Sequence, residues 1–292
     1  MTDTVQRFHF SESPVRGEVV HLGDSLKAVL DCHAYPERVI TLLGEAITAS
    51  VLLTSPLKFE GSLILQIRGD GPLRTLMAEC NHRRELRAIV QVADGWNEQT
   101  AALPLSQLFG NGQLVITIDP ENGQRYQGIV PLNNDKLSEC IEHYFEQSEQ
   151  LPTRLWLACN GESAAGLMLQ ALPGYDKSED ADMWPRLCQL TETVTDQELL
   201  DLPTTELLYR LYHEETVELH GTKEVCFKCS CSRMRTEQAL FSLGEAELRN
   251  IIKEQGSINV SCQFCNREYG FDPIDVEQIL RGGTGGGSAQ LH

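Results

Sequence analysis

The residues of this sequence best suited to chemistry are five cysteines between positions 226 and 265. Cys226, Cys229 and Cys231 stand close together, and Cys262 and Cys265 follow after thirty intervening residues. Two close-set cysteine groups separated by the length of a helical hairpin are typical of a tetrahedral zinc site with four thiolate ligands. We therefore predict one Zn2+ per chain, whose binding free energy would help to fold a segment with few core residues of its own.

Five thiols for four ligand positions leave two possible ligand sets on spacing alone. One set combines Cys226 and Cys229 with the later pair and makes two CxxC knuckles, as in a zinc ribbon, which is a static structural or nucleic-acid-binding element. The other set combines Cys229 and Cys231 with the later pair and makes a CxC and a CxxC. Neighbouring thiolates at such spacings can be oxidised to disulfides, which would eject the metal.

The chain before these cysteines mixes strand-like and helix-like patterns. Apolar and β-branched runs bounded by turn residues predict strands over residues 62–68, 86–92, 113–119, 125–130, 154–159 and 166–172. Apolar residues at helical spacing predict helices over 37–53 and 135–148. Because the strands are grouped after one helix and do not alternate strictly with helices, we predict an α+β domain with a largely antiparallel sheet over residues 1–174.

Residues 175–224 are strongly acidic, with thirteen Asp or Glu against four Lys or Arg. Thr195 and Glu198 fit a capping box at the start of one helix, Pro203 interrupts that helix, and a second helix is predicted over 205–216. We interpret this region as a linker of short, marginally stable helices that must dock on another surface. An ordinary helical extension of the first domain is the alternative.

The rest of the chain divides into two further parts. Residues 225–280 form the predicted zinc-binding module, which carries six Lys or Arg and eight Asp or Glu. Residues 281–292 are rich in glycine and predict a flexible tail.

Composition and charge exclude several classes of protein. The 292 residues carry a formal net charge of -18, which argues against a general attraction to nucleic acid or to an anionic membrane surface. No apolar run is long enough to span a bilayer, and the first ten residues lack the apolar core of a signal peptide. We therefore expect a cytoplasmic protein with reduced thiols, including the isolated Cys32, Cys80, Cys140, Cys159 and Cys188.

The sequence offers no constellation of catalytic residues. Four thiolates would close the zinc site, whereas a catalytic zinc needs an open position and usually has His or carboxylate ligands. The CxxC does not open a helix after a strand, as in thioredoxin-like sites, and His213 and His220 have no second His four residues later. We predict that the protein is not an enzyme.

Several stretches resemble the 33-kDa heat-shock protein family of redox-regulated chaperones. Residues 229–233 (CSCSR) and 262–271 (CQFCNREYGF) are similar to the redox-switch domain of that family. Residues 128–131, 144–153, 172–174 and 198–212 are similar to other parts of it, in the same order. The resemblance implies an α+β N-terminal domain, a metastable helical linker and a C-terminal zinc module. The implied activity is that of an ATP-independent holdase in the bacterial cytoplasm, inactive when reduced and zinc-bound.

The resemblance also implies roles for individual cysteines. It assigns the zinc ligands to Cys229, Cys231, Cys262 and Cys265, and leaves Cys226 as an accessory thiol that departs from the family pattern. Oxidation would form the disulfides Cys229–Cys231 and Cys262–Cys265, release zinc and unfold the linker. The apolar surface uncovered in this way would bind unfolded client proteins, with a homodimer as the active form. A zinc-ribbon nucleic-acid-binding protein is the competing hypothesis, disfavoured because the module lacks a basic face.

Overall fold

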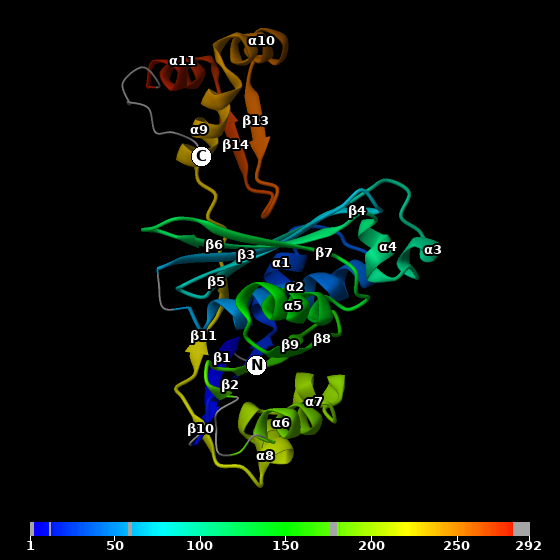
Figure 1. Cartoon of the computed structure of the whole chain (residues 1–292). Coiled ribbons are helices and arrows are strands. Elements are labelled where there is room, and N and C mark those ends of the chain that lie inside the picture. The colour runs from blue at the N-terminus through cyan, green and yellow to red at the C-terminus, as the bar shows by residue number, and fades with distance from the viewer. Residues whose placement is uncertain (1–2, 12, 58–59, 176–179, 181, 283–292) are drawn as a thin grey trace. The chain divides into compact units, whose positions relative to one another are not determined.

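The computed structural model describes residues 3–11, 13–57, 60–175, 180 and 182–282. Its contacts divide the chain into two compact units, Met1–Lys228 and Cys229–His292. The first unit holds two β-sheets and most of the helices, and the second is a small helical module with one hairpin (Figure 1).

The first sheet of the larger unit has the strand order β10-β1-β2-β9-β8, and β11 also pairs with β1. Its strands are β1 (Thr4–Phe10), β2 (Val15–Leu22), β8 (Thr153–Cys159), β9 (Ala164–Ala171), β10 (Val217–Leu219) and β11 (Lys223–Glu224). All of these pairings are antiparallel. Strands from the two ends of the unit therefore lie side by side in one sheet.

The second sheet has the strand order β12-β5-β4-β3-β6-β7. Its strands are β3 (Gly61–Arg68), β4 (Leu73–Asn81), β5 (Glu85–Val92), β6 (Gln113–Pro120), β7 (Tyr126–Pro131) and β12 (Cys226–Phe227). Its pairings are antiparallel except the short parallel pairing of β12 with β5. The predicted α+β class with a largely antiparallel sheet is confirmed, with two sheets in place of one.

Helix α2 (Glu37–Thr54) occupies the centre of the larger unit and contacts strands of both sheets (Figure 1). Its last two turns consist of apolar or small residues and are buried throughout. This composition allows the helix to be covered on nearly all sides. The other helices of this region are α1 (Asp24–Leu30), α3 (Glu98–Ala101), α4 (Leu105–Phe109) and α5 (Leu137–Tyr144), which continues into a π-helical turn, Phe145–Glu149. The two predicted helices are thus present.

All six predicted strands are present, but β1, β2 and β4 are strands that the sequence patterns did not indicate. In β4, Met77, Ala78 and Glu79 have low intrinsic preference for strands, yet β4 pairs with β3 and β5 on its two edges. In β2, Gly17 weakens the strand pattern, but a Cβ at this position would overlap the ring of Phe8. Tertiary packing overrides local preference at both places.

Three short helices cover the face of the first sheet opposite α2: α6 (Met183–Thr191), α7 (Asp196–Asp201) and α8 (Thr204–Tyr212). They share a second hydrophobic core with strands of that sheet. The helical residues of this core are Leu187, Leu199, Leu207, Leu208, Leu211 and Tyr212, and the strand residues include Phe8, Phe10, Val19, Leu167 and Leu169. The predicted capping box of Thr195 and Glu198 is present, and Pro203 separates α7 from α8 as the N-cap residue of α8.

The second unit contains α9 (Arg233–Leu243), α10 (Glu245–Gln255), β13 (Ile258–Ser261), β14 (Glu268–Phe271) and α11 (Pro273–Gly282). Gly244, with a φ of 90°, joins α9 to α10 and produces the helical hairpin that the cysteine spacing suggested. Its core consists of Leu240, Leu248, Ile258, Phe271 and Val276. Such a small core supplies little stability alone, which is consistent with a need for a metal.

The predicted division of the chain at residues 175, 225 and 281 stays a prediction. Val225 packs in the core of the first unit, and Cys226 and Phe227 form β12 there. The predicted tail lies outside the described residues from position 283 onward. Within the described part of the chain, no helix combines the length and apolar character needed to cross a membrane.

Candidate metal centre

Two short segments of the second unit present the four clustered thiols. Cys229 and Cys231 flank Ser230 and lie directly before α9, whose first turn is capped by Ser232 accepting a hydrogen bond of 3.2 Å from the Arg235 amide. The cap fixes the first residue of α9 and therefore the position of the CxC segment that precedes it. Cys262 and Cys265 lie in the turn between β13 and β14.

The hairpin turn is held by its own backbone. The Cys262 amide donates to the Arg267 carbonyl at 2.9 Å, and the Asn266 amide donates to the Cys262 carbonyl at 2.8 Å. Asn266 has a φ of 54°, in the left-handed region that asparagine tolerates better than most residues. This geometry closes the loop tightly and directs both thiols of the CxxC toward the thiols of Cys229 and Cys231.

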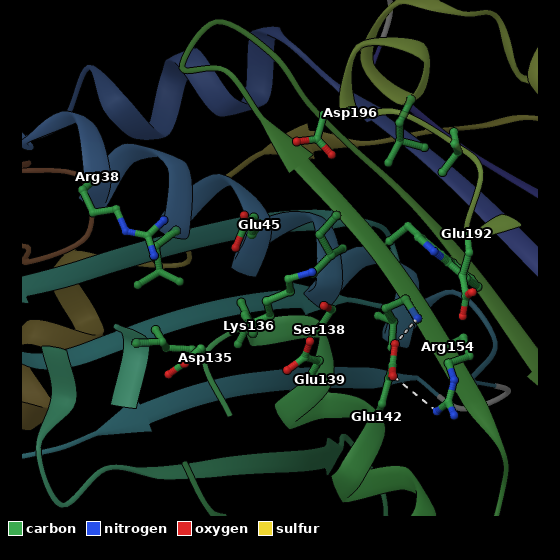
Figure 2. A pocket seen from close by; sticks show the side chains of 18 residues that line it. Arg38, Glu45, Asp135, Lys136, Ser138, Glu139, Glu142, Arg154, Glu192 and Asp196 are labelled. Atoms are coloured by element: carbon green, nitrogen blue, oxygen red, sulfur yellow. Dashed lines mark hydrogen bonds and ion pairs between the residues drawn. The ribbon is translucent and has the colours of Figure 1, made fainter. Parts of the chain in front are cut away.

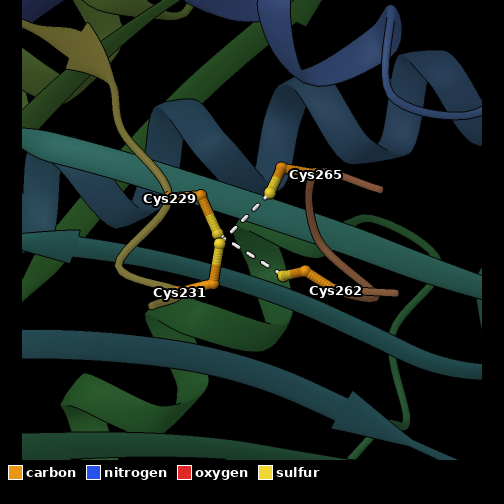
Figure 3. Close-up of side chains that lie close together, drawn as sticks. All are labelled: Cys229, Cys231, Cys262 and Cys265. Carbon is orange, nitrogen blue, oxygen red and sulfur yellow. Dashed lines mark hydrogen bonds between the residues drawn. The ribbon is translucent and has the colours of Figure 1, made fainter. Parts of the chain in front are cut away.

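The four sulfur atoms converge on one point (Figure 3). Cys229 Sγ lies 3.7 Å from Cys262 Sγ, Cys231 Sγ lies 3.4 Å from Cys265 Sγ, and all four lie within 4.8 Å of one another. A tetrahedral zinc site with Zn–S bonds of about 2.3 Å separates its sulfur atoms by about 3.8 Å. The group therefore has the size and the donor type that suit a thiolate-bound zinc ion, and among the described residues it is the one group of three or more such side chains this compact.

The surroundings of Cys231 and Cys229 shift the pKa values of these two thiols in opposite directions. Burial has the largest influence on Cys231 and opposes its ionisation, but hydrogen bonds from Tyr269 and the neighbouring thiols outweigh it and lower its pKa to about 7. Burial, with smaller contributions from the neighbouring thiols, raises the pKa of Cys229 to about 12. Tyr269 Oη donates to Cys231 Sγ at 3.2 Å, and this hydrogen bond favours the thiolate form of Cys231.

Arg233 joins the elements that carry the thiols. Its guanidinium lies 2.8 Å from the carboxylate of Asp275, donates to the Gly270 carbonyl at 2.8 Å and lies 4.4 Å from the centre of the Phe271 ring. The start of α9 is thereby fixed to β14 and α11. Neither Arg233 nor Tyr269 was assigned a role from the sequence, although both lie within the two motifs that carry the family resemblance.

The remaining cysteines lie elsewhere. Cys226 is exposed on β12, and its amide donates to the Arg84 carbonyl at 3.1 Å, so it does not belong to the group of four thiols. The isolated Cys80, Cys140 and Cys188 are buried, and Cys32 and Cys159 are half-buried. Burial raises the pKa of Cys80 to about 12 and that of Cys188 to about 11, which makes both thiols poor nucleophiles.

A cavity of about 670 Å3 in the first unit also gathers ionisable groups (Figure 2). Its lining comes from α2, α5, β8 and the segment around α7, and includes the carboxylates of Glu45, Asp135, Glu139, Glu142, Glu192 and Asp196. Glu142 accepts a hydrogen bond from the Leu155 amide at 2.8 Å and lies 3.3 Å from Arg154. Burial raises the pKa of Glu45 to about 7, and Asp196 raises it further while Arg38 and Lys136 oppose the shift.

Comparisons with known proteins agree on one family. A sequence model described as Hsp33 protein matches residues 3–272. The 33 kDa chaperonin of Nitrosococcus oceani is 48% identical over 278 residues, covering 95% of this chain and 94% of that protein. The 33 kDa chaperonin of Ectopseudomonas mendocina is 48% identical over 287 residues, covering 97% and 96%. The crystal structure of an Hsp33 homologue from Thermotoga maritima has the same fold, with a TM-score of 0.81 over 96% of this chain and 99% of that chain at 23% identity.

Proposed function

Because this chain belongs to the Hsp33 family, we propose that it is a redox-regulated, ATP-independent holdase that binds unfolding proteins under oxidative stress. The observation that supports the regulation most directly is the convergence of four thiols within 4.8 Å in a unit with a small apolar core. The three-part division into a core domain, a linker and a redox-switch module belongs to this proposal, as does a cytoplasmic location.

In the reduced protein, Cys229, Cys231, Cys262 and Cys265 hold one Zn2+. A bound zinc ion would supply a cross-link between the CxC segment and the β13–β14 hairpin and would keep the thiols ionised. The hydrogen bond from Tyr269 to Cys231 supports this state because it favours the thiolate form of Cys231. The protein is inactive in this form.

Oxidation by hypochlorite converts the four thiolates into two disulfides, Cys229–Cys231 and Cys262–Cys265. As each disulfide forms, its two thiolates together give up two electrons, which reduce one hypochlorite to chloride, and the oxygen of the hypochlorite leaves as hydroxide or water. A disulfide sulfur is a poor ligand for zinc, so the module loses its cross-link. The small core of Leu240, Leu248 and Phe271 then holds the module alone, and its stability falls.

Loss of the module destabilises the acidic linker, residues 175–224. Helices α6, α7 and α8 have six to nine residues each, which is too short for stability in isolation. Their undocking uncovers the second core, including Phe8, Phe10 and Leu167 on the sheet and Leu207 and Leu211 on α8. A contiguous apolar surface of this kind binds unfolded chains, and the net charge of -18 keeps the loaded complex in solution. The active form is a homodimer.

The decisive experiment measures zinc content and suppression of citrate synthase aggregation on one sample, first reduced and then treated with hypochlorite. We expect one zinc per chain in the reduced protein without suppression, and zinc release together with suppression after oxidation. Reduction with dithiothreitol in the presence of Zn2+ should reverse both changes.

Two outcomes would contradict the proposal. Zinc that stays bound after oxidation, with no suppression, would indicate a static zinc module, and a salt-sensitive nucleic-acid shift assay would then test the zinc-ribbon hypothesis. Turnover of insulin disulfides by the CxxC would instead indicate a thiol oxidoreductase.

A further inference from the structure

A pair of histidines far apart in the sequence meets on the first sheet. His9 lies on β1, and His220 follows β10, the strand reached after the linker helices. His9 Nδ1 and His220 Nε2 are 3.1 Å apart, and the two rings stack with centroids separated by 5.0 Å. The strand pairing opposes His9 to Glu218, and the His220 amide donates to the Arg7 carbonyl at 2.9 Å, so both histidines and Glu218 lie on the same face of the ladder.

Glu218 controls which nitrogen of His9 carries a proton. Its Oε2 lies 3.3 Å from His9 Nε2, and its Oε1 accepts a hydrogen bond of 2.6 Å from Ser11 Oγ. A carboxylate oxygen can only accept, so the proton of neutral His9 belongs on Nε2. The lone pair of His9 Nδ1 then faces His220. A metal-binding histidine is commonly arranged in this way, with a carboxylate holding its second nitrogen.

We propose that His9 and His220 form a second metal site, for a divalent transition ion such as Zn2+, with Glu218 as its outer carboxylate. Metal–nitrogen bonds of about 2.0–2.1 Å place two ligand nitrogens about 2.9 Å apart at a right angle and about 3.4 Å apart at a tetrahedral angle. The 3.1 Å between the two ring nitrogens falls between these limits. His220 needs only to carry its proton on Nδ1 for both lone pairs to bind the same ion.

The surroundings leave room for the other ligands. Both histidines are accessible, with 37% of the His9 side chain exposed, and His220 borders an open cavity of about 380 Å3. Water molecules can therefore complete the coordination. Arg7 and Lys223 line the same cavity; the positive charge of Arg7 is paired with Glu18 at 2.7 Å, and Lys223 lies on β11 opposite Val5. Two neutral imidazoles bind zinc less tightly than four thiolates do, so this site would exchange its metal while the cysteine site keeps its own.

The position of the site gives it a consequence for the linker. β10 is joined to α8 by only four residues, and α8 packs on Phe8 and Phe10 of β1, the neighbours of His9. A metal held by His9 and His220 would fasten β10 to β1 and so favour the docked linker, because a ligand stabilises the state that binds it. This consequence for activation rests on the proposed function, whereas the metal site itself does not.

The test is a calorimetric titration of ZnCl2 into the reduced full-length protein that already carries one zinc. We expect one additional Zn2+ per chain, and we expect His9→Gln and His220→Gln each to weaken this second binding at least tenfold. Glu218→Gln should weaken it about tenfold, as loss of an outer carboxylate does. His213→Gln, at the exposed C-terminal end of α8, is the matched control and should retain the second zinc.

Hydrogen exchange supplies an independent measurement. Zinc in excess of the first equivalent should slow amide exchange at residues 217–220 of the unaltered protein and not of His220→Gln. Binding of only one zinc, or a second zinc that persists unchanged when both histidines are replaced, would overturn the site. Either result would leave the proposed function intact, because that function is tested by zinc release from the cysteines and by aggregation assays.

Discussion

Tyr212 donates a hydrogen bond to Thr191 in the core between α6 and α8. The direction of this bond follows from the partners, because the single hydroxyl proton of Thr191 is used in a 2.7 Å hydrogen bond to the Leu187 carbonyl, which leaves Tyr212 Oη as the donor. Both side chains are fully buried. The bond therefore connects α6 to α8 at a place that water does not reach.

Tyr212→Phe should loosen the packing of α6–α8 on the first sheet without changing their fold. The substitution removes a buried hydroxyl and leaves Thr191 with an unused acceptor, at a cost of about 1 kcal/mol. We expect faster amide exchange in α6–α8 of the reduced protein and, on the proposed function, activation by hypochlorite at a lower temperature. Tyr209→Phe is the matched control, since Tyr209 lies on the same helix and is 71% exposed. Equal exchange rates in both variants would show that this bond does not stabilise the packing of α6–α8.

Cys262→Ser and Cys226→Ser should have opposite effects on metal content. Replacing Cys262 removes one of the four converging thiols, so we expect loss of tight zinc binding and an unfolded second unit under reducing conditions. Replacing Cys226 should leave one zinc per chain, because this thiol lies on β12 outside the group of four. Zinc analysis after gel filtration makes the comparison. Loss of zinc in Cys226→Ser would favour the ligand set of a zinc ribbon.

Tyr269→Phe should weaken zinc retention while leaving all four thiols in place. Tyr269 Oη donates to Cys231 Sγ at 3.2 Å and helps to lower the pKa of that thiol to about 7 against the effect of burial. Without the hydroxyl the pKa of Cys231 rises, so more protons compete with zinc at neutral pH. We expect a loss of affinity of about tenfold or more in a chelator competition assay at pH 7, and a smaller loss at pH 9. Tyr126→Phe, at an exposed tyrosine of the first unit, is the control and should leave the zinc affinity unchanged.

Sequence patterns predicted this fold where local and tertiary preferences agree. The strands with alternating or β-branched apolar residues, such as 113–119, were found, as was α2, whose apolar spacing is regular. β4 was missed because Met77, Ala78 and Glu79 do not favour strands. They form a strand because β4 pairs with β3 on one edge and with β5 on the other. The division of the β-structure into two sheets could not be found in the sequence, because it depends on pairings such as β1 with β10, more than 200 residues apart.

The metal centre was predictable to a similar degree. Cysteine spacing indicated a four-thiol site but left two ligand sets open, and the structure brings together Cys229, Cys231, Cys262 and Cys265. Tyr269 could not be assigned a partner from spacing, because its contact with Cys231 depends on how β14 lies beside the CxC segment. The pairing of His9 with His220 and the cavity near Glu45 were equally beyond sequence patterns, since each joins distant segments.

Glu45 should make the stability of the first unit depend on pH in an unusual direction (Figure 2). Burial is the main reason that its pKa in the folded protein is about 7, compared with 4.5 for an ordinary glutamate, so the folded state binds a proton more tightly than the unfolded state does. The contribution of Glu45 is therefore fully favourable below pH 4.5, is lost as the pH rises through 7, and stays lost above that.

Glu45→Gln removes this ionisation and should raise the free energy of unfolding at pH 8 by on the order of 1–2 kcal/mol, a value reduced for the partial exposure of the side chain. At pH 4.5 the variant and the unaltered protein should be nearly equally stable. Urea unfolding followed by tryptophan fluorescence reports on the correct unit, because Trp96, Trp156 and Trp184 all lie before residue 228. Glu98→Gln, at an exposed carboxylate of α3, should show no such dependence. A stability difference that stays constant from pH 4.5 to pH 8 would mean that Glu45 is ionised throughout this range, with Arg38 and Lys136 offsetting its burial.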